Sequence, residues 1–320
     1  MVLISPELYK AYGRFDSVVL IGCRASGAFG DYCEFDLLIP FERFNLVRER
    51  RGGDYFDLHF IPWEELEGSE LAQEVALGSF KVIRDEDWAL SPYIYELSCR
   101  REEVAKAYAE KKRREAEESL MRVHDALEFG DELSASYWLY AATYSVAEAY
   151  VSRREVVRRS HILAQLRGCE VYGRVSELLR LTMGSKVTAW RRLDALRCLA
   201  EHVKRRRLKG RGLAYLHIDP QGLRMEEERG IKMVRDGRVA ELYASLGMLL
   251  VKGLKEIYVA ECEKEGVRPY YERIAKELVK VFGLEELVFK LSGFTAHREE
   301  VEEGLKELRG MLRGLGERAS

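Results

Sequence analysis

The sequence predicts an α+β protein, in which a small mixed β-sheet domain at residues 1–97 precedes a larger all-helical domain at residues 98–320. Up to about residue 97, short runs of β-type residues alternate with turn residues. From about Cys99 onward, apolar residues recur with the 3.6-residue period of a helix. The length of 320 residues is that of about two domains. We therefore expect a sheet first and a helical bundle after it.

The first domain is expected to begin with a helix that starts at Ser5 and Pro6 and runs to Phe15. Ser is a good N-cap, and Pro fits the first helical turn because its missing N–H has no partner there. Alternating or continuous apolar runs then predict four strands. These strands are expected at residues 17–21, 34–39, 55–61 and 80–83, with a helix at residues 64–77 before the last one.

The second domain is expected to consist of helices of very different lengths. The segments with helical periodicity are residues 100–129, 134–151, 156–166, 171–181, 186–207, 239–265, 270–282 and 296–315. The stretch 209–237 is rich in glycine and charge, so we expect a long connection with a short helical piece and a sub-boundary near residues 208–237.

Composition and charge exclude several classes of protein. With 52 Lys and Arg against 54 Asp and Glu, the net charge of -2 excludes a protein that is basic all over and coats nucleic acid. No apolar run approaches the roughly 18 residues of a membrane span, and the N-terminus lacks the pattern of a secretory signal. We expect a cytoplasmic protein with no membrane partner, and a homodimer is compatible with the sequence.

The polar residues and cysteines indicate a thermophile protein. One Asn and three Gln stand among many Glu, Lys and Arg, a bias typical of hyperthermophile proteins. The six cysteines include no CxxC pair of the kind that binds zinc. We expect structural thiols, although intracellular disulfides do occur in hyperthermophiles.

Residues 18–39 carry the most informative motif, VVLIGCRASGAFGDYCEFDLLI. The first strand is expected to end at Gly22, where the absence of a Cβ lets a bound group approach the backbone. A short helix over residues 23–28 would then offer free N–H groups to an anion such as phosphate. In the next strand Glu34 and Asp36 are two residues apart, so they project from the same face.

The same alternation places Asp57 and His59 on one face of the third strand. If this strand lies beside the second, Glu34, Asp36 and Asp57 converge near Gly22. Three carboxylates beside a phosphate-binding turn predict a Mg²⁺ site for nucleotide chemistry. The alternative is that these acids lie on a solvated sheet edge.

The motif resembles the signature of polymerase-β-like nucleotidyltransferases of the small prokaryotic kind. That signature is an apolar strand, Gly-Ser, an Ala-Arg-Gly-like turn and then Ser-Asp-apolar-Asp-Leu. Gly22 matches the first glycine, Ala25 and Gly27 match the turn, residues 36–39 match the second acidic strand, and residues 55–58 look like the third. The resemblance covers roughly the first 90 residues.

The resemblance implies transfer of a nucleoside monophosphate from ATP or another nucleoside triphosphate, with Mg²⁺ or Mn²⁺ as the cofactor. The acceptor would be a small molecule, a protein or an RNA. The implied catalytic and metal-binding residues are Glu34, Asp36 and Asp57, and the implied nucleotide contacts are Gly22, Cys23, Gly27 and His59. For His59, a supporting contact to Asp57 is an alternative role.

Four positions depart from the signature. Cys23 and Cys33 replace Ser, Ser26 replaces Arg, and Glu34 replaces the first metal-binding Asp. A thiol is a weaker donor than a hydroxyl, and Mg²⁺ demands near-ideal ligand geometry. The second hypothesis is therefore a catalytically degenerate nucleotide-binding or interaction protein of the same fold.

The helical domain suggests a third hypothesis, an HEPN-like ribonuclease, because HEPN ribonucleases carry an Arg and a His separated by four to six intervening residues. Arg154 and His161 fit this spacing, but Arg197 with His202 and Arg211 with His217 fit it equally well, so the pattern carries little information. The basic clusters near residues 111–114, 153–159 and 204–211 would attract RNA phosphates or form ion-pair networks. Glu148 is a candidate general base because an isolated acid in an apolar helix needs a reason.

Overall fold

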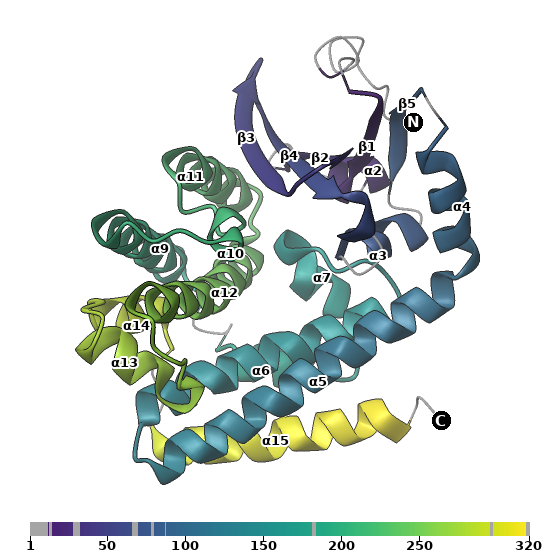
Figure 1. Ribbon diagram of the computed structural model, residues 1–320. Helices are drawn as coiled ribbons and strands as arrows, with labels where there is room; N and C mark the ends of the chain where they lie inside the picture. Colours follow the sequence, from purple (N-terminus) through teal and green to yellow (C-terminus); the bar gives the residue numbers. More distant parts are fainter. Residues whose placement is uncertain are drawn as a thin grey trace. The chain divides into compact units, whose positions relative to one another are not determined.

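We describe the protein from a computed structural model, shown in Figure 1. It describes residues 12, 15–27, 33–65, 70–77, 80–86, 88–180, 184–294 and 297–317. The chain forms two compact units, an N-terminal unit of residues 1–109 and 152–158, and a helical unit of residues 110–151 and 159–320. An N-terminal mixed sheet followed by a helical bundle confirms the α+β prediction. The expected helix start at Ser5 and Pro6 lies outside the described residues.

The N-terminal unit is built on a mixed five-stranded sheet. Its strands are β1 (Ser17–Ile21), β2 (Phe35–Phe41), β3 (Asn45–Arg51), β4 (Asp54–Pro62) and β5 (Lys81–Asp85). They lie in the order β3-β4-β2-β1-β5, as Figure 1 shows for the strands that it labels. β2 and β4 are parallel and the other neighbouring pairs are antiparallel. The second and third predicted strands, β2 and β4, are thus direct neighbours.

Each face of the sheet buries an apolar cluster, because side chains alternate along the strands. One cluster includes Leu20, Leu37 and Leu58. The other includes Val19 and Leu38, and it is covered by α3 (Glu70–Ala76) and α4 (Leu90–Cys99). By strand parity, Asp36 and Asp57 share this second face. The 3-10 turn η1 (Trp63–Glu65) and α3 replace the single helix expected at residues 64–77, of which residues 66–69 lie outside the described part.

Two elements of the N-terminal unit differ from the prediction. β3 was not predicted, because its sequence NLVRERR is mostly charged or polar; it is an edge strand that pairs with β4 alone. α4 was not predicted either. Its start is fixed by Asp85, whose Oδ2 accepts hydrogen bonds from the Ser91 backbone N–H at 2.9 Å and hydroxyl at 2.7 Å. β3 thus depends on its pairing with β4, whereas the start of α4 depends on an acid six residues before Ser91.

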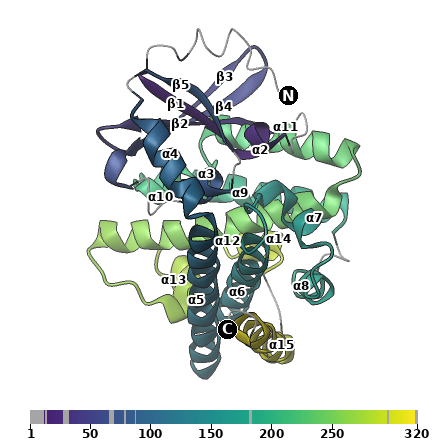
Figure 2. The same ribbon diagram turned by 90° about the vertical axis from the view of Figure 1, so that its right-hand side faces the viewer.

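The helical unit contains long and short helices. Its elements are α5 (Arg101–Glu128), which begins in the N-terminal unit, α6 (Glu132–Ser152), η2 (Arg159–His161), α7 (Ile162–Leu166), α8 (Tyr172–Leu178), α9 (Lys186–Arg206), α10 (Arg211–Ala214), α11 (Pro220–Arg235), α12 (Val239–Glu265), η4 (Tyr271–Arg273), α13 (Ile274–Lys280), α14 (Leu287–Ser292) and α15 (Arg298–Glu317). α5, α6 and α15 lie side by side in both views (Figures 1 and 2). Among the described helices, none is long and apolar enough to cross a membrane.

The long helices match their expected bounds closely, but α11 does not. Residues 209–237 were expected to be a connection, yet α11 covers Pro220–Arg235. Asp219 caps this helix, because its Oδ1 accepts the backbone N–H of Gln221 at 3.0 Å and of Gly222 at 2.9 Å. The Asp-Pro pair is a standard helix start, so the signal was present but was outweighed by the glycine and charge content.

Candidate functional site

The two acidic strands bring Asp36 and Asp57 together. These residues are register partners on the parallel strands β2 and β4. One carboxylate oxygen from each and a ring nitrogen of His59 lie within 4.8 Å of one another, and we call these three residues the Asp36 group. In the described part of the chain this group does not include Glu34, which directly precedes β2. The structure therefore brings together two of the three predicted carboxylates and adds the predicted histidine.

Asp36 has an electrostatically unfavourable position for a carboxylate. Burial and the negative charge of Glu34 raise its pKa to about 7, and the charge of Asp57 acts in the same direction. His59 opposes this shift, with Nε2 3.5 Å from Asp36 Oδ1. A carboxyl group with so high a pKa lies where negative charge is poorly compensated.

Gly22 makes room for the Asp36 carboxylate. Its φ of +77° disfavours any residue with a side chain, and a Cβ at this position would lie 2.4 Å from Asp36 Oδ2. The expected close approach at Gly22 therefore exists, but the approaching group is a carboxylate of the protein itself. The Gly22 N–H donates to Glu74 Oε2 on α3 at 3.3 Å, and Arg158 pairs with the same carboxylate. The carboxylate of Glu74 thus accepts the Gly22 N–H at the turn where a phosphate was expected to bind.

Asp57 is held by an arginine that the sequence analysis missed. Arg48 on β3 donates from Nε to Oδ1 at 2.9 Å and from Nη2 to Oδ2 at 3.2 Å. Both side chains are nearly inaccessible, at 5% for Arg48 and 3% for Asp57. β4 lies between β3 and β2, so Arg48 reaches Asp57 from the strand opposite to that of Asp36. The pair was not visible in the sequence because β3 itself was not predicted.

The turn after Gly22 forms the short helix α2 (Gly22–Ser26). Gly27 ends it with a φ of +76°, and a Cβ there would meet nothing within 4 Å, so its described role is to end the helix. Arg24, which the sequence analysis did not single out, donates from Nε to the carbonyl of Cys33 at 2.9 Å. This bond joins α2 to the segment that leads into β2.

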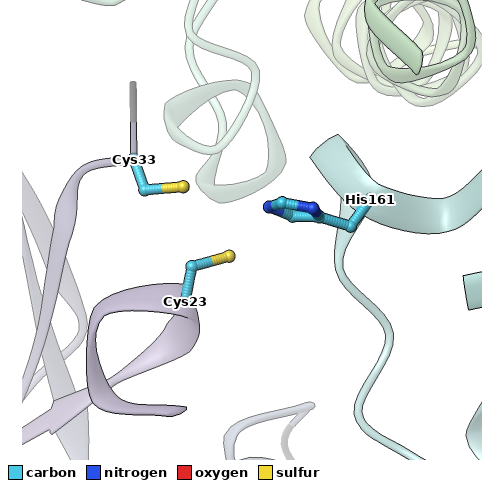
Figure 3. Close-up of side chains that lie close together, drawn as sticks. All are labelled: Cys23, Cys33 and His161. Atoms are coloured by element: carbon cyan, nitrogen blue, oxygen red, sulfur yellow. The ribbon is translucent and has the colours of Figure 1, made fainter. Parts of the chain in front are cut away.

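Cys23 and Cys33 face the same space beside α2. Figure 3 shows the two side chains extending in the same direction with their sulfur atoms one above the other. The sulfur atoms lie within 4.8 Å. A hydrogen bond to Cys33 and burial raise the pKa of Cys23 well above that of a free thiol, so Cys23 is protonated at neutral pH.

The residues of the Asp36 group fit a divalent cation. Carboxylate oxygens are the ligands that Mg²⁺ and Mn²⁺ prefer, and imidazole is acceptable to Mn²⁺. The raised pKa of Asp36 indicates negative charge that a cation would neutralise. The ion pair of Asp57 with Arg48 weakens this fit, since the guanidinium competes with a cation for the same oxygens.

The other predicted functional residues have protein partners. In the helical unit Glu148 is buried and lies 2.9 Å from Lys112 Nζ, which explains an acid in an apolar helix without a catalytic role. His202 Nε2 lies 2.8 Å from Glu261 Oε1, and His217 Nδ1 lies 2.7 Å from Glu226 Oε1. Basic residues of all three clusters also pair with acids. Those pairs are Arg113 with Glu110 and Glu117, Arg158 with Glu74, Arg159 with Glu226, and Arg206 with Glu261 and Glu265.

Comparison with known proteins does not identify a family. The chain matches no protein-family model, no curated protein and no solved structure. The function is therefore argued from the geometry of the site and from the resemblance of its motif.

Proposed function

We propose that the N-terminal unit is a divalent-cation-dependent nucleotidyltransferase, acting on a nucleoside triphosphate and an acceptor that is a small molecule, a protein or an RNA. One observation carries the proposal: Asp36 and Asp57 are register partners on parallel strands, and one carboxylate oxygen of each lies within 4.8 Å of the other and of a ring nitrogen of His59. The resemblance of residues 18–39 to the nucleotidyltransferase signature supports it independently.

The roles of the residues follow from their positions. Asp36 and Asp57 would hold Mg²⁺ or Mn²⁺, and His59, 3.5 Å from Asp36, would orient the Asp36 carboxylate or join the ligands. A bound cation would neutralise the triphosphate and promote attack by the acceptor hydroxyl. Glu34 is next to the group and raises the pKa of Asp36, so its charge would strengthen cation binding even without direct contact.

Binding would position the triphosphate beside Gly22, whose N–H donates to Glu74 Oε2 at 3.3 Å. The ion pair between Glu74 and Arg158 lies at this position. Arg158 could meet a phosphate if Glu74 moved away, since guanidinium groups bind phosphate oxygens well. Catalysis of this kind depends mainly on positioning and on charge neutralisation.

The Arg48–Asp57 ion pair favours a second candidate function. If Arg48 stays paired with Asp57 when nucleotide binds, Asp36 and His59 are the two members of the Asp36 group that can still ligate a cation. The unit would then bind nucleotide without transferring it. The replacement of Ser by Cys23 and of Asp by Glu34 in the motif agrees with this candidate.

Label transfer separates the two candidates. The full chain is incubated with α-labelled nucleoside triphosphates, Mn²⁺ or Mg²⁺, and acceptors that include RNA and the protein itself. The proposal predicts metal-dependent release of pyrophosphate and label on an acceptor, both lost in Asp36→Asn. The control Asp16→Asn makes the same chemical change at an exposed position of the same unit and should retain transfer.

Calorimetry with a non-hydrolysable ATP analogue completes the test. Binding without transfer in the wild type would replace the first candidate by the second. Absence of both binding and transfer, in a folded protein, would contradict both candidates.

A further inference from the structure

The cysteine pair beside α2 is not used by the proposed function. Cys23 is half-buried and Cys33 is buried, and their sulfur atoms lie within 4.8 Å (Figure 3). A hydrogen bond already joins the two thiols. The remaining cysteines of the N-terminal and helical units, such as the exposed Cys99 and the half-buried Cys198, belong to other segments. Proximity of the two sulfur atoms is one geometric requirement for a disulfide.

We propose that Cys23 and Cys33 form a reversible disulfide that links α2 to the start of β2. The bond would close a ring between two segments that already approach each other, because Arg24 Nε donates to the Cys33 carbonyl at 2.9 Å. The backbone therefore needs little rearrangement to form it. The thermophile-like composition makes an intracellular disulfide chemically reasonable.

The reaction is a thiol–disulfide exchange with a low-molecular-weight disulfide such as oxidised glutathione. At alkaline pH, where the raised pKa of Cys23 still allows loss of its proton, the thiolate of the more accessible Cys23 attacks one sulfur of the oxidant and releases the first small thiolate, which takes up a proton. Cys33 then attacks the Cys23 sulfur of the mixed disulfide and releases the second. Two protein thiols lose two electrons and two protons, and the oxidant gains them as two small thiols. A reducing dithiol reverses the exchange.

The bond has a consequence for the site, which rests on the proposed function. Cys23 stands where the resembling family has a phosphate-binding Ser, and a disulfide removes its S–H donor. Cys33 directly precedes Glu34, so the bond also restrains the residue that acts on Asp36. We expect the oxidised protein to bind nucleotide several-fold more weakly than the reduced protein.

Peptide mapping tests the bond directly. Full-length protein is equilibrated with oxidised glutathione, alkylated and digested with trypsin without reduction. Cleavage after Arg24 separates the two cysteines, so the bond would join peptides 15–24 and 25–43 with the loss of two hydrogen atoms. The thermal midpoint of the oxidised protein should exceed that of the reduced protein by about 5 °C. Both effects should vanish in Cys33→Ser and persist in Cys99→Ser.

The outcomes are distinct from those of the functional test. Glutathione retained on Cys23, or peptides 15–24 and 25–43 with both cysteines alkylated, would overturn the proposed bond. The linked peptides together with equal nucleotide affinity of both forms would overturn its effect on the site. Failure of both forms to bind an ATP analogue would count against the proposed function and would leave the mapped bond established.

Discussion

Two acidic residues, Asp36 in the N-terminal unit and Glu226 in the helical unit, differ in how their charge is compensated. Glu226 is fully buried, yet Arg159, Arg229 and a hydrogen bond from His217 outweigh burial and hold its pKa well below the ordinary value. All three partners contact Oε1 at 2.7–2.8 Å. For Asp36, burial and Glu34 prevail over His59, and the pKa rises to about 7.

On the proposed function, this difference separates a structural acid, Glu226, from an acid that binds a cation, Asp36. The helical unit surrounds Glu226 with cations, so its charge contributes to folding. The N-terminal unit surrounds Asp36 mainly with other acids, which costs folding free energy and is typical of a site that binds a cation. The following predictions test the contrast, beginning with the largest effect.

The largest effect is expected from Glu226→Gln. The substitution leaves Arg159 and Arg229 without their buried counterion, so the free energy of unfolding should fall by about 3–5 kcal/mol. The control is Glu227→Gln, which removes an exposed ion pair with Arg197 and should cost less than about 1 kcal/mol. Urea unfolding of both variants measures the difference. Equal losses of unfolding free energy would mean that the buried ion pairs of Glu226 stabilise the protein no more than an exposed pair does.

Next in size is the effect of a side chain at Gly22. Gly22→Ala adds a Cβ 2.4 Å from Asp36 Oδ2 to a backbone at φ +77°. We expect a loss of about 3 kcal/mol, from left-handed strain and displacement of the carboxylate. Gly27→Ala has the same backbone strain at φ +76° but open space, and should cost about 1 kcal/mol. Thermal unfolding compares them, and indistinguishable midpoints would argue against close packing of Asp36 on Gly22.

The sequence predicted the fold well where the pattern is local. Strands β1, β2 and β4 and the long helices α5, α9 and α12 were predicted almost to their bounds, because apolar periodicity is a property of the segment itself. β3 escaped prediction because the charged run NLVRERR becomes a strand only through pairing with β4.

The site was predictable only in part, for the same reason. Alternation showed that Asp57 and His59 share a face, and the parallel pairing of β2 with β4 brings Asp36 to them. The positions of Arg48 and Glu74 depend on strand register and on helix packing, which no local pattern in the sequence encodes. Arg48 pairs with Asp57, and Glu74 accepts the Gly22 N–H, so both residues contact the predicted site directly.

A smaller effect is expected from Asp36→Asn, with a sign opposite to that of Glu226→Gln. The folded-state pKa of about 7 lies above the ordinary value of about 3.9, so ionised Asp36 destabilises the folded state fully above pH 7 and progressively less as the pH falls toward 4. In the absence of divalent cations, Asp36→Asn should stabilise the protein at pH 8 by about 2 kcal/mol, roughly half of what a shift of about three pKa units is worth, because the Asp36 side chain is 23% exposed to solvent, and hardly at all near pH 4. Unfolding at both pH values measures this, and destabilisation at pH 8 would contradict an uncompensated Asp36.

The smallest change in free energy is expected from Arg48→Gln, and it concerns the binding of Mn²⁺. Removal of the guanidinium frees the oxygens of Asp57, so Mn²⁺ should bind about tenfold more tightly, a gain of about 1.4 kcal/mol. Arg50→Gln on the same strand, where the side chain is exposed, should leave the affinity unchanged. Calorimetric titration with Mn²⁺ measures both affinities. Weaker Mn²⁺ binding in Arg48→Gln would show that Arg48 supports cation binding instead of competing with the cation for Asp57.

Cation binding by the Asp36 group is the central claim, and calorimetric titration with Mn²⁺ tests it most directly. The wild type and Asp16→Asn should each take up Mn²⁺ with the same affinity, and Asp36→Asn should lose that binding while remaining folded. Unchanged Mn²⁺ affinity in Asp36→Asn, or no measurable binding by the wild type, would contradict the claim.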